Sequence, residues 1–361
     1  MPYTFSFFDL WPYLIIGLVF ILCIFNKTIY SSRIIFFTLF LFCALRYDVG
    51  WDYTSYVSDF ENGYLAVLNG RYEPLSTVIM LISIVLNFYP LIFILFSLIT
   101  LKLVFDIINK YSINPVISWL VFYALPLFFF ASLSTLRQSL ATVIVVYSFK
   151  YAIEKKYIKF FISIIIAYMF HSSGIVGVLI LPLVILPINK SLNYVLFISS
   201  FFLAALTKSV FTTYFSDFSV FERFQEYYLD ADTASSTTLQ YLYYFIALFN
   251  LIFYDKLVNL NVLNKKFIAI STFGVVIFNI LSFEPISASR ISAFFLMFWI
   301  FIFPYYSRLF QTKYEKVIEL VLLVLLITLS FYYLNMYIDS YENKIQEKVS
   351  FLPYQFWWNN L

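Results

Sequence analysis

Long apolar runs, separated by short polar connectors, make up most of this 361-residue chain. A helix that crosses a membrane needs about 17–25 apolar residues, and several of the runs approach that length. The runs cover residues 11–25, 32–45, 91–108, 115–132, 137–153, 157–171, 173–189, 192–209, 239–254, 267–283, 290–306 and 317–336. The pattern predicts an all-α, polytopic integral membrane helix bundle with about 12–14 membrane segments. With no linker visible, we expect one transmembrane domain over residues 1–361.

The composition supports this class. Hydrophobic residues make up 62% of the chain and charged residues 12%, whereas a soluble domain carries roughly 25% charge. Aromatic residues, at 23%, suit the belts that form at membrane interfaces. Cys23 and Cys43 fall inside apolar runs, so we interpret them as small hydrophobic residues and not as a disulfide. The first residues carry no basic charge, so the first run is expected to be an anchor and not a cleaved signal.

Basic residues fall in alternate connectors, which orients the chain. Connectors rich in Lys and Arg stay on the cytoplasmic side. Placing them there, together with Lys102 and Lys150, gives that side 15 of the 23 Lys and Arg but only 5 of the 20 Asp and Glu. These connectors are Asn26–Arg33, Lys110, Glu154–Lys159, Lys190, Asp255–Lys266 and Ser307–Lys316. The orientation puts Arg137, His171 and Arg290 on the outer face.

One further apolar segment, residues 74–88, disturbs the alternation. If Lys27 and Arg33 lie inside, Arg46 lies outside, and the later orientation holds only if residues 74–88 do not cross. We favour a re-entrant or half-buried segment, of the kind found where protein or water covers the backbone. The alternative is a full crossing, with another boundary misplaced.

Two outer segments are long enough to contribute to chemistry, residues 46–73 and residues 210–238. Both mix carboxylates with aromatic side chains, a combination with which proteins bind sugars, because rings stack on the apolar sugar face and carboxylates accept hydroxyl protons. Candidate sugar-binding residues are Asp48, Tyr53, Tyr56 and Gln138.

Several chemistries lack their usual residues. The seven glycines form no phosphate-binding loop, which argues against nucleotide chemistry. With one His and two Cys, a zinc site cannot form in the usual way. We therefore expect no metal and no cofactor, and no partnership with nucleic acid.

Three arginines and the one histidine stand at the ends of apolar runs. Ionisable groups near hydrocarbon are costly, so they are candidates for function. Arg137 and Arg290 each open a run; a cation there is unfavourable for the helix itself, but a guanidinium can bind phosphate oxygens in two places. The alternative for Arg137 is an arginine that only reaches the interface. For Arg46, which closes its run, an ion pair with Asp48 competes with substrate binding.

A catalytic base has three candidates. His171 has an unperturbed pKa near ~6.5 and could be a base or a phosphate donor, although a plain polar cap is the alternative. Asp52 and Glu73 compete for the role. Asp48 and Asp52 would share a helical face if their loop coils, which Gly50 disfavours.

These residues resemble the EpsG-type branch of the Wzy polysaccharide polymerases of bacterial O-antigen, capsule and exopolysaccharide loci. The resemblance rests on short motifs that follow in order along most of the chain. They are Arg46–Tyr56 (Arg…Gly-x-Asp-Tyr…Tyr), Glu73-Pro74, Arg137-Gln138-Ser139-Leu140-Ala141, Phe170-His171-Ser172-Ser173 and Arg290, with a weaker match at Pro353-Tyr354. A departure is Trp51, where a small residue is commoner.

The resemblance implies a multi-pass glycosyltransferase of the bacterial cytoplasmic membrane whose site faces the periplasm or exterior. Such enzymes use oligosaccharide repeat units linked to undecaprenyl pyrophosphate as donor and acceptor. Membrane lipid and a chain-length regulator protein are the other expected partners. The alternatives are a lipid-linked oligosaccharide flippase and a polysaccharide ligase.

Combined with the residues, this gives a specific hypothesis. Arg137 and Arg290 hold the pyrophosphate, Arg46 assists, and Asp52 or His171 activates the acceptor hydroxyl, with Glu73 as the competing base.

Overall fold

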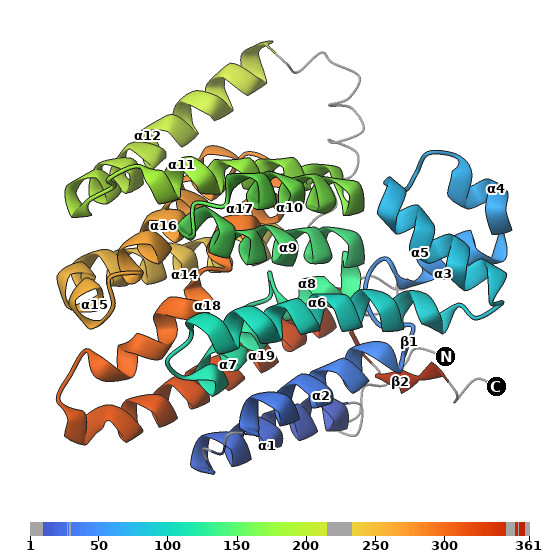
Figure 1. The fold of residues 1–361 in the computed structure, drawn as a ribbon, viewed down its shortest axis with the longest axis horizontal. Helices are drawn as coiled ribbons and strands as arrows, with labels where there is room; N and C mark the ends of the chain where they lie inside the picture. Colours follow the sequence, from blue (N-terminus) through green and yellow to red (C-terminus); the bar gives the residue numbers. More distant parts are fainter. Residues whose placement is uncertain are drawn as a thin grey trace. The chain divides into compact units, whose positions relative to one another are not determined.

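The computed structural model describes residues 10–343 and 351–357, except residues 27, 29, 215–232 and 353. The described chain is helical apart from one pair of two-residue strands, as the all-α prediction requires (Figure 1). It forms two compact units: Met1–Leu181 with Phe303–Leu361, and Pro182–Ile302. No linker in the sequence marks this division.

Unit 1 contains most of the predicted spans and both strands. Its elements are α1 (Trp11–Phe25), α2 (Ser31–Ala44), β1 (Arg46–Tyr47), α3 (Tyr53–Glu61), α4 (Gly63–Leu68), α5 (Pro74–Val85), α6 (Pro90–Tyr111), α7 (Pro115–Ala124), α8 (Phe129–Ser134), α9 (Leu136–Ile153), α10 (Tyr157–Phe170), η2 (Ser172–Leu179), η3 (Phe303–Arg308), η4 (Thr312–Tyr314), α19 (Glu315–Asn343) and β2 (Gln355–Phe356).

Unit 2 is a smaller group of helices. Its elements are α12 (Lys190–Tyr214), α14 (Thr233–Ile252), α15 (Tyr254–Leu260), α16 (Asn264–Ile280), α17 (Pro285–Leu296) and α18 (Trp299–Ile302), while α11 (Ile180–Ile185) runs across the division. The predicted outer segment 210–238 lies largely outside the described residues.

Proline divides some of the predicted spans. The run 115–132 becomes α7 and α8, because Leu125 is extended (φ −81°, ψ 121°) and Pro126 follows it. Proline lacks the backbone N–H that a continuing helix would use, and it disfavours helical geometry in the residue before it.

The lengths of the helices bear on the predicted number of crossings. Among the described residues, four helical stretches are long and apolar enough to cross a membrane, and α14 with α15, bent by 69°, would make a fifth. Six further apolar helices are shorter, so they would cross only with a thinned bilayer or a paired partner. The protein is thus a multi-pass membrane bundle, and the number of crossings stays a prediction.

The 74–88 segment forms α5, a helix of 12 residues. At 1.5 Å per residue its length is about 18 Å, well short of the roughly 30 Å of a hydrocarbon core. It packs on α6 and α10 and ends at Val85, two residues before Asn87, which has a positive φ of 49°. This length agrees with a segment that does not cross on its own.

Unit 1 has two polar ends. Phe93, near the start of α6, lies against Arg46, whereas Lys110 at the end of α6 pairs with Glu154 at 2.8 Å. Lys110 lies 17 positions after Phe93, which corresponds to a rise of about 25 Å along a helix. Arg46 and the Lys110–Glu154 pair are therefore separated by nearly the thickness of a hydrocarbon core.

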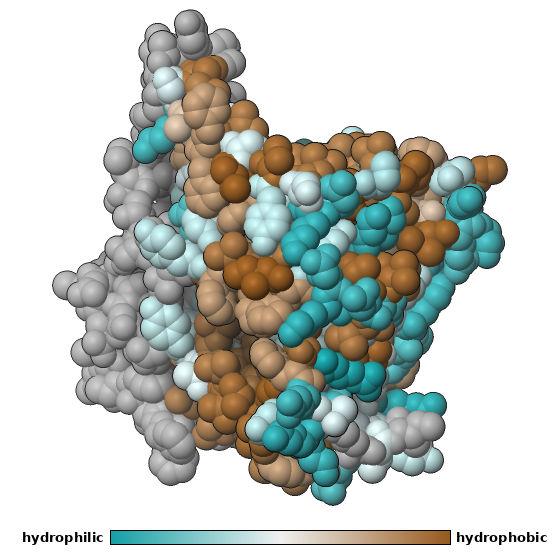
Figure 2. Space-filling model, turned by 90° about the vertical axis from the view of Figure 1, so that its left-hand side faces the viewer, coloured by the Kyte–Doolittle hydropathy of each residue, from teal (hydrophilic) through white to brown (hydrophobic). Residues whose placement is uncertain are grey.

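The surface matches a membrane environment. Figure 2 shows hydrophobic residues over much of one face, with hydrophilic residues in patches among them. Large apolar side chains such as Phe25, Ile158 and Phe202 are exposed. Apolar surface on this scale is unstable in water and favourable in hydrocarbon.

Candidate functional site

Arg46 is a buried structural residue, only 1% exposed. Its Nε donates to Val49 O at 3.0 Å, Nη1 to Cys43 O at 2.6 Å and Nη2 to Leu133 O at 3.1 Å. Its guanidinium also lies 4.9 Å from the centre of the Phe93 ring. These contacts correct both sequence hypotheses, diphosphate binding and an ion pair with Asp48, because the donors serve backbone carbonyls away from solvent.

The loop after Arg46 is fixed against the junction of α8 and α9. Gly50 has a φ of +105°, and a Cβ there would lie 2.0 Å from the Leu133 carbonyl oxygen. The N–H of Trp51 donates to Ser134 Oγ at 3.1 Å. The loop is thereby held against Ser134, three residues before Arg137 near the start of α9.

The C-terminal segment closes the same end of unit 1. β2 pairs antiparallel with β1, with Arg46 opposite Phe356, and the Tyr354 hydroxyl donates to Phe42 O at 2.6 Å. Tyr354 had matched the family pattern only weakly; Pro353 lies outside the described residues.

The predicted sugar-binding residues are less accessible than their loop position indicates. Tyr53, Tyr56 and Gln138 are buried, and the Tyr53 ring stacks on Phe93 at 4.3 Å. Asp48 is half-buried. Direct contact between sugars and the three buried side chains therefore has no support in this arrangement, and their assignment stays a prediction.

Asp48 and Asp52 do not share a helical face, contrary to that alternative. Asp48 has a positive φ of 51° and lies before α3, which begins just after Asp52. Burial raises the pKa of the Tyr56 hydroxyl, the Arg137 charge lowers it, and the Asp52 charge raises it. Half-buried Asp52 therefore lies within electrostatic reach of Tyr56.

Arg137 stands at the centre of a polar cluster. Its Nη1 donates to Glu73 Oε2 at 2.6 Å and to Arg71 O at 3.3 Å, and its Nε donates to the Tyr56 hydroxyl at 3.3 Å. Its guanidinium lies 4.8 Å from the centre of the Tyr72 ring. The Tyr72 ring and the Glu73 carboxylate hold the guanidinium in place. The side chain is still 20% exposed and is therefore accessible to a ligand.

Glu73 connects α9 to η2. While Oε2 accepts from Arg137, Oε1 accepts from the backbone N–H of Ser172 at 2.9 Å. Burial alone would raise the pKa of this carboxyl, but the Ser172 N–H and the Arg137 charge bring it below the ordinary value. A carboxylate so stabilised is a weak base, which favours a positioning role for Glu73 over the predicted catalytic one.

His171 caps η2 through its ring. The backbone N–H of Ser173 donates to Nδ1 at 3.2 Å, and Ser173 Oγ lies 2.7 Å from the same nitrogen. Because a backbone N–H can only donate, Nδ1 carries the lone pair. The neutral ring then carries its proton on Nε2, so His171 presents a donor there.

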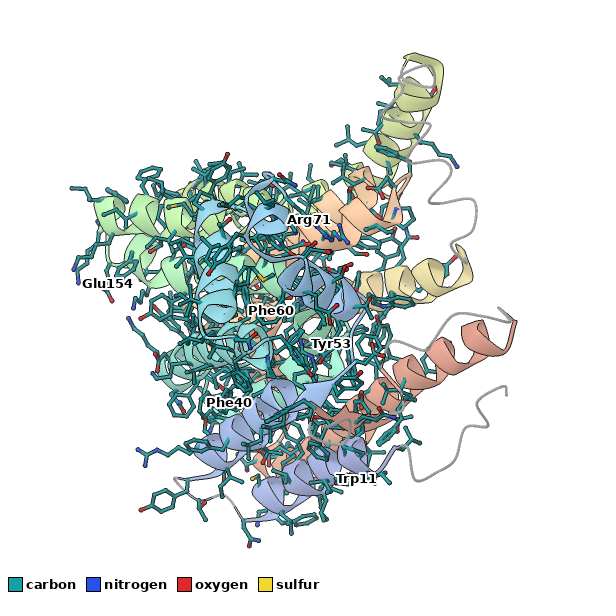
Figure 3. All side chains as sticks on the ribbon, turned by 90° about the vertical axis from the view of Figure 1, so that its right-hand side faces the viewer. Trp11, Phe40, Tyr53, Phe60, Arg71 and Glu154 are labelled. Carbon is teal, nitrogen blue, oxygen red and sulfur yellow. The ribbon has the colours of Figure 1, made fainter. Side chains whose placement is uncertain are left out.

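Three residues that the sequence did not single out complete the cluster. Asp59 Oδ2 accepts from Arg71 Nη1 at 2.5 Å and from the Tyr72 hydroxyl. Burial and the Asp59 carboxylate raise the pKa of Tyr72, so its hydroxyl stays a neutral donor. Figure 3 looks onto this end of unit 1, with Arg71 and Tyr53 labelled. The run Gly70-Arg71-Tyr72-Glu73-Pro74 was the available signal.

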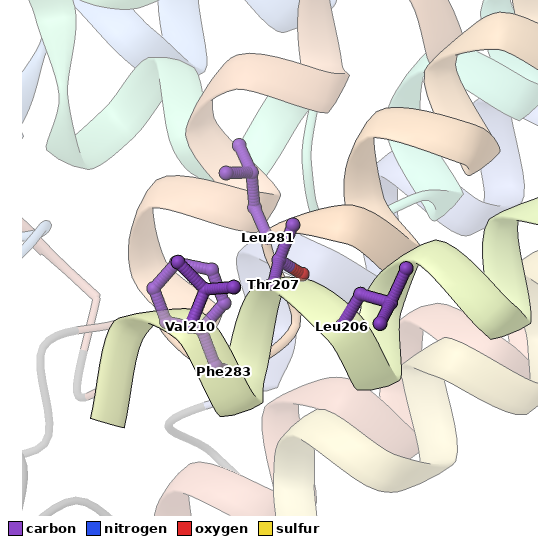
Figure 4. A pocket seen from close by; sticks show the side chains of 5 residues that line it. All are labelled: Leu206, Thr207, Val210, Leu281 and Phe283. Atoms are coloured by element: carbon purple, nitrogen blue, oxygen red, sulfur yellow. The ribbon is translucent and has the colours of Figure 1, made fainter. Parts of the chain in front are cut away.

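Arg290 belongs to unit 2. It is exposed in the second turn of α17, a helix whose Glu284 cap accepts from the Ser287 N–H at 2.8 Å. Its convergence with Arg137 stays a prediction. Unit 2 also has an apolar hollow, lined by Leu206, Thr207, Val210, Leu281 and Phe283 (Figure 4). Among the described residues no three His, Cys, Asp or Glu side chains gather as a metal site would require.

Comparison with known proteins gives one match. No curated protein and no solved structure matches the chain. The model of the EpsG family matches residues 29–356, nearly the whole chain. The match includes Arg137, Glu73 and His171, and the chain therefore belongs to the EpsG family.

Proposed function

We propose that this membrane protein polymerises oligosaccharide repeat units linked to undecaprenyl pyrophosphate into a surface polysaccharide, on the outer face of the bacterial cytoplasmic membrane. Membership of the EpsG family points to polysaccharide biosynthesis. The observation that carries the finer proposal is the Arg137 guanidinium, held by Glu73 and Tyr56 at one polar end of unit 1. An accessible guanidinium near the headgroup plane suits a diphosphate leaving group.

The proposed reaction exchanges one bond for another. The acceptor hydroxyl oxygen attacks the anomeric carbon of the donor, and the carbon–oxygen bond to the diphosphate breaks with its electron pair leaving on the diphosphate. The hydroxyl proton passes to a base. Arg137 stabilises the negative charge that develops on the leaving group.

Among the three predicted bases we favour Asp52, because its charge acts on Tyr56, whose hydroxyl accepts from Arg137 Nε. Glu73 already binds Arg137 and Ser172 through its two oxygens, and His171 presents a proton on Nε2 in its neutral form. His171 then suits hydrogen bonding to a phosphate or sugar oxygen.

Two substitutions at His171 separate the capping role of Nδ1 from the donor role of Nε2. His171→Asn keeps an oxygen that can accept from the Ser173 N–H but loses the Nε2 donor, so its thermal stability should stay near wild type while turnover falls on the order of 10- to 100-fold. His171→Gln, with an amide N–H near the Nε2 position, should retain more activity. Polymer formation per minute and melting temperature are the measurements. A fully active His171→Asn would assign the ring to capping alone.

The competing functions are transport of the lipid-linked unit and ligation of finished polymer. Purified protein, given only one lipid-linked repeat unit, distinguishes them. A ladder of products that differ by one repeat unit supports polymerisation. Unchanged substrate, with protein that is folded by its melting curve, would refute it in favour of transport or ligation.

A further inference from the structure

A second arginine, Arg71, lies close to Arg137 in unit 1. Arg46, which was expected to assist Arg137, is buried and donates to three carbonyls. Its guanidinium is therefore not available as a second cation beside Arg137. Arg71 is the arginine beside it: its own carbonyl accepts from Arg137 Nη1 at 3.3 Å. Unlike Arg46, its side chain is 51% exposed.

Both arginines are arranged around one aromatic ring. The guanidinium carbon of Arg137 lies 4.8 Å and that of Arg71 lies 5.8 Å from the centre of the Tyr72 ring. The two carbons can therefore be no farther apart than the sum of these distances. The Tyr72 hydroxyl donates to Asp59, which fixes the shared ring.

Each arginine binds its carboxylate partner through its own Nη1 nitrogen. Glu73 accepts from Nη1 of Arg137, and Asp59 accepts from Nη1 of Arg71. Within the part of the chain that the structure describes, Nη2 of neither arginine donates a hydrogen bond. The carboxylates thus fix each guanidinium by one nitrogen and leave another for a ligand.

Each guanidinium is already paired with one carboxylate, so the N–H donors that remain determine the kind of ligand the cluster can hold. Two fixed guanidinium groups offer several aligned N–H donors, and a diphosphate has oxygens on two phosphorus atoms to accept them. A single carboxylate or sugar hydroxyl could use only one of the two groups. The spacing through one shared tyrosine ring therefore favours a diphosphate.

We propose that Arg71 is the second arginine of the diphosphate site, and that the Nη2 groups of Arg71 and Arg137 bind the two phosphates of the lipid-linked substrate. This assignment rests on the proposed function for the nature of the substrate. It makes residues 59–73 of the outer loop part of the binding site, in place of Arg46.

The test is equilibrium binding of farnesyl diphosphate and of farnesol to the full-length protein in lipid nanodiscs. Arg71→Gln should weaken diphosphate binding on the order of 10- to 100-fold and leave farnesol binding unchanged. The matched control is Arg308→Gln, because Arg308 is 50% exposed and also pairs with a carboxylate, Glu315; it should bind the diphosphate as wild type does.

The outcomes separate this assignment from the proposed function. If wild-type protein prefers farnesyl diphosphate to farnesol and Arg71→Gln binds it equally well, Arg71 is not part of the site. If the wild type shows no preference for the diphosphate, the proposed function itself loses its basis. A loss that extends equally to farnesol, or a lowered melting temperature in Arg71→Gln, would point to misfolding and would also overturn the assignment.

Discussion

Replacing Arg137 with alanine is expected to abolish polymer and to leave single-repeat product on the cell surface. The side chain donates to Glu73, Tyr56 and the Arg71 carbonyl, so its loss removes both the proposed phosphate contact and the partner that orients Glu73. Loss of one such charge-stabilising donor typically lowers turnover by about 10²–10³-fold. Chain lengths of surface polysaccharide, resolved on a gel, measure the effect.

The control for Arg137 lies on the same helix. Lys150, in the last turn of α9, is a cation at the other polar end of unit 1, and Lys150→Ala should give wild-type chain lengths. Arg137→Lys should resemble alanine more than wild type, because one ammonium cannot reproduce the fork of donors. Wild-type chain lengths in Arg137→Ala would remove the residue from the mechanism.

Replacing Arg46 with alanine should destabilise the protein and not merely weaken substrate binding. The change leaves the carbonyls of Cys43, Val49 and Leu133 without their buried donor and opens space beside Phe93. Such a change typically costs on the order of 3–5 kcal/mol. The apparent melting temperature in detergent is the measurement.

An exposed arginine serves as the control that tests whether burial of Arg46 causes the lowered melting temperature. Arg33 on α2 is exposed, so Arg33→Ala should melt close to wild type. If Arg46→Ala also melts at the wild-type temperature but no longer binds farnesyl diphosphate, Arg46 is a ligand residue and the structural role assigned to it is wrong.

The helices were predictable because a membrane constrains sequence strongly. Continuous apolar runs predicted the bounds of α9 and α10 to within one residue, because the charged residues Arg137 and Lys156 mark where the two runs begin. Breaks were less visible. Pro126 interrupts a run that we predicted as one span. A pattern based on hydrophobicity does not detect the loss of one backbone N–H at a proline.

The site was predictable in part. Arg137 and His171 stood out at the ends of apolar runs and Glu73 as a candidate base. The structure brings Glu73 to Arg137 and to Ser172, next to His171. The role of Arg46 was not predictable, because one of its acceptors, the Leu133 carbonyl, is 87 residues away in the chain.

Asp59 and Arg71 were missed for a different reason. Both lie in the polar segment 46–73, where α3 and α4, with nine and six residues, are too short to show a clear helical period. Their pairing depends on the turn at Gly70, which has a φ of +80°. Sequence distance alone does not indicate which carboxylate such a turn brings to Arg71.

We propose that the end of unit 1 with Arg137 faces outward and that lipid-linked units are polymerised there. Cys23 and Cys43 are buried, so single cysteines at exposed Tyr64 on α4 and at Lys156 report on opposite ends of unit 1. The direct measurement is polymer formed in proteoliposomes from repeat unit added outside, compared with labelling by a membrane-impermeant thiol reagent. Polymer yield should rise with the fraction of Tyr64→Cys protein that is labelled. Yield that instead follows the labelling of Lys156→Cys, or no polymer in either orientation, would contradict the account.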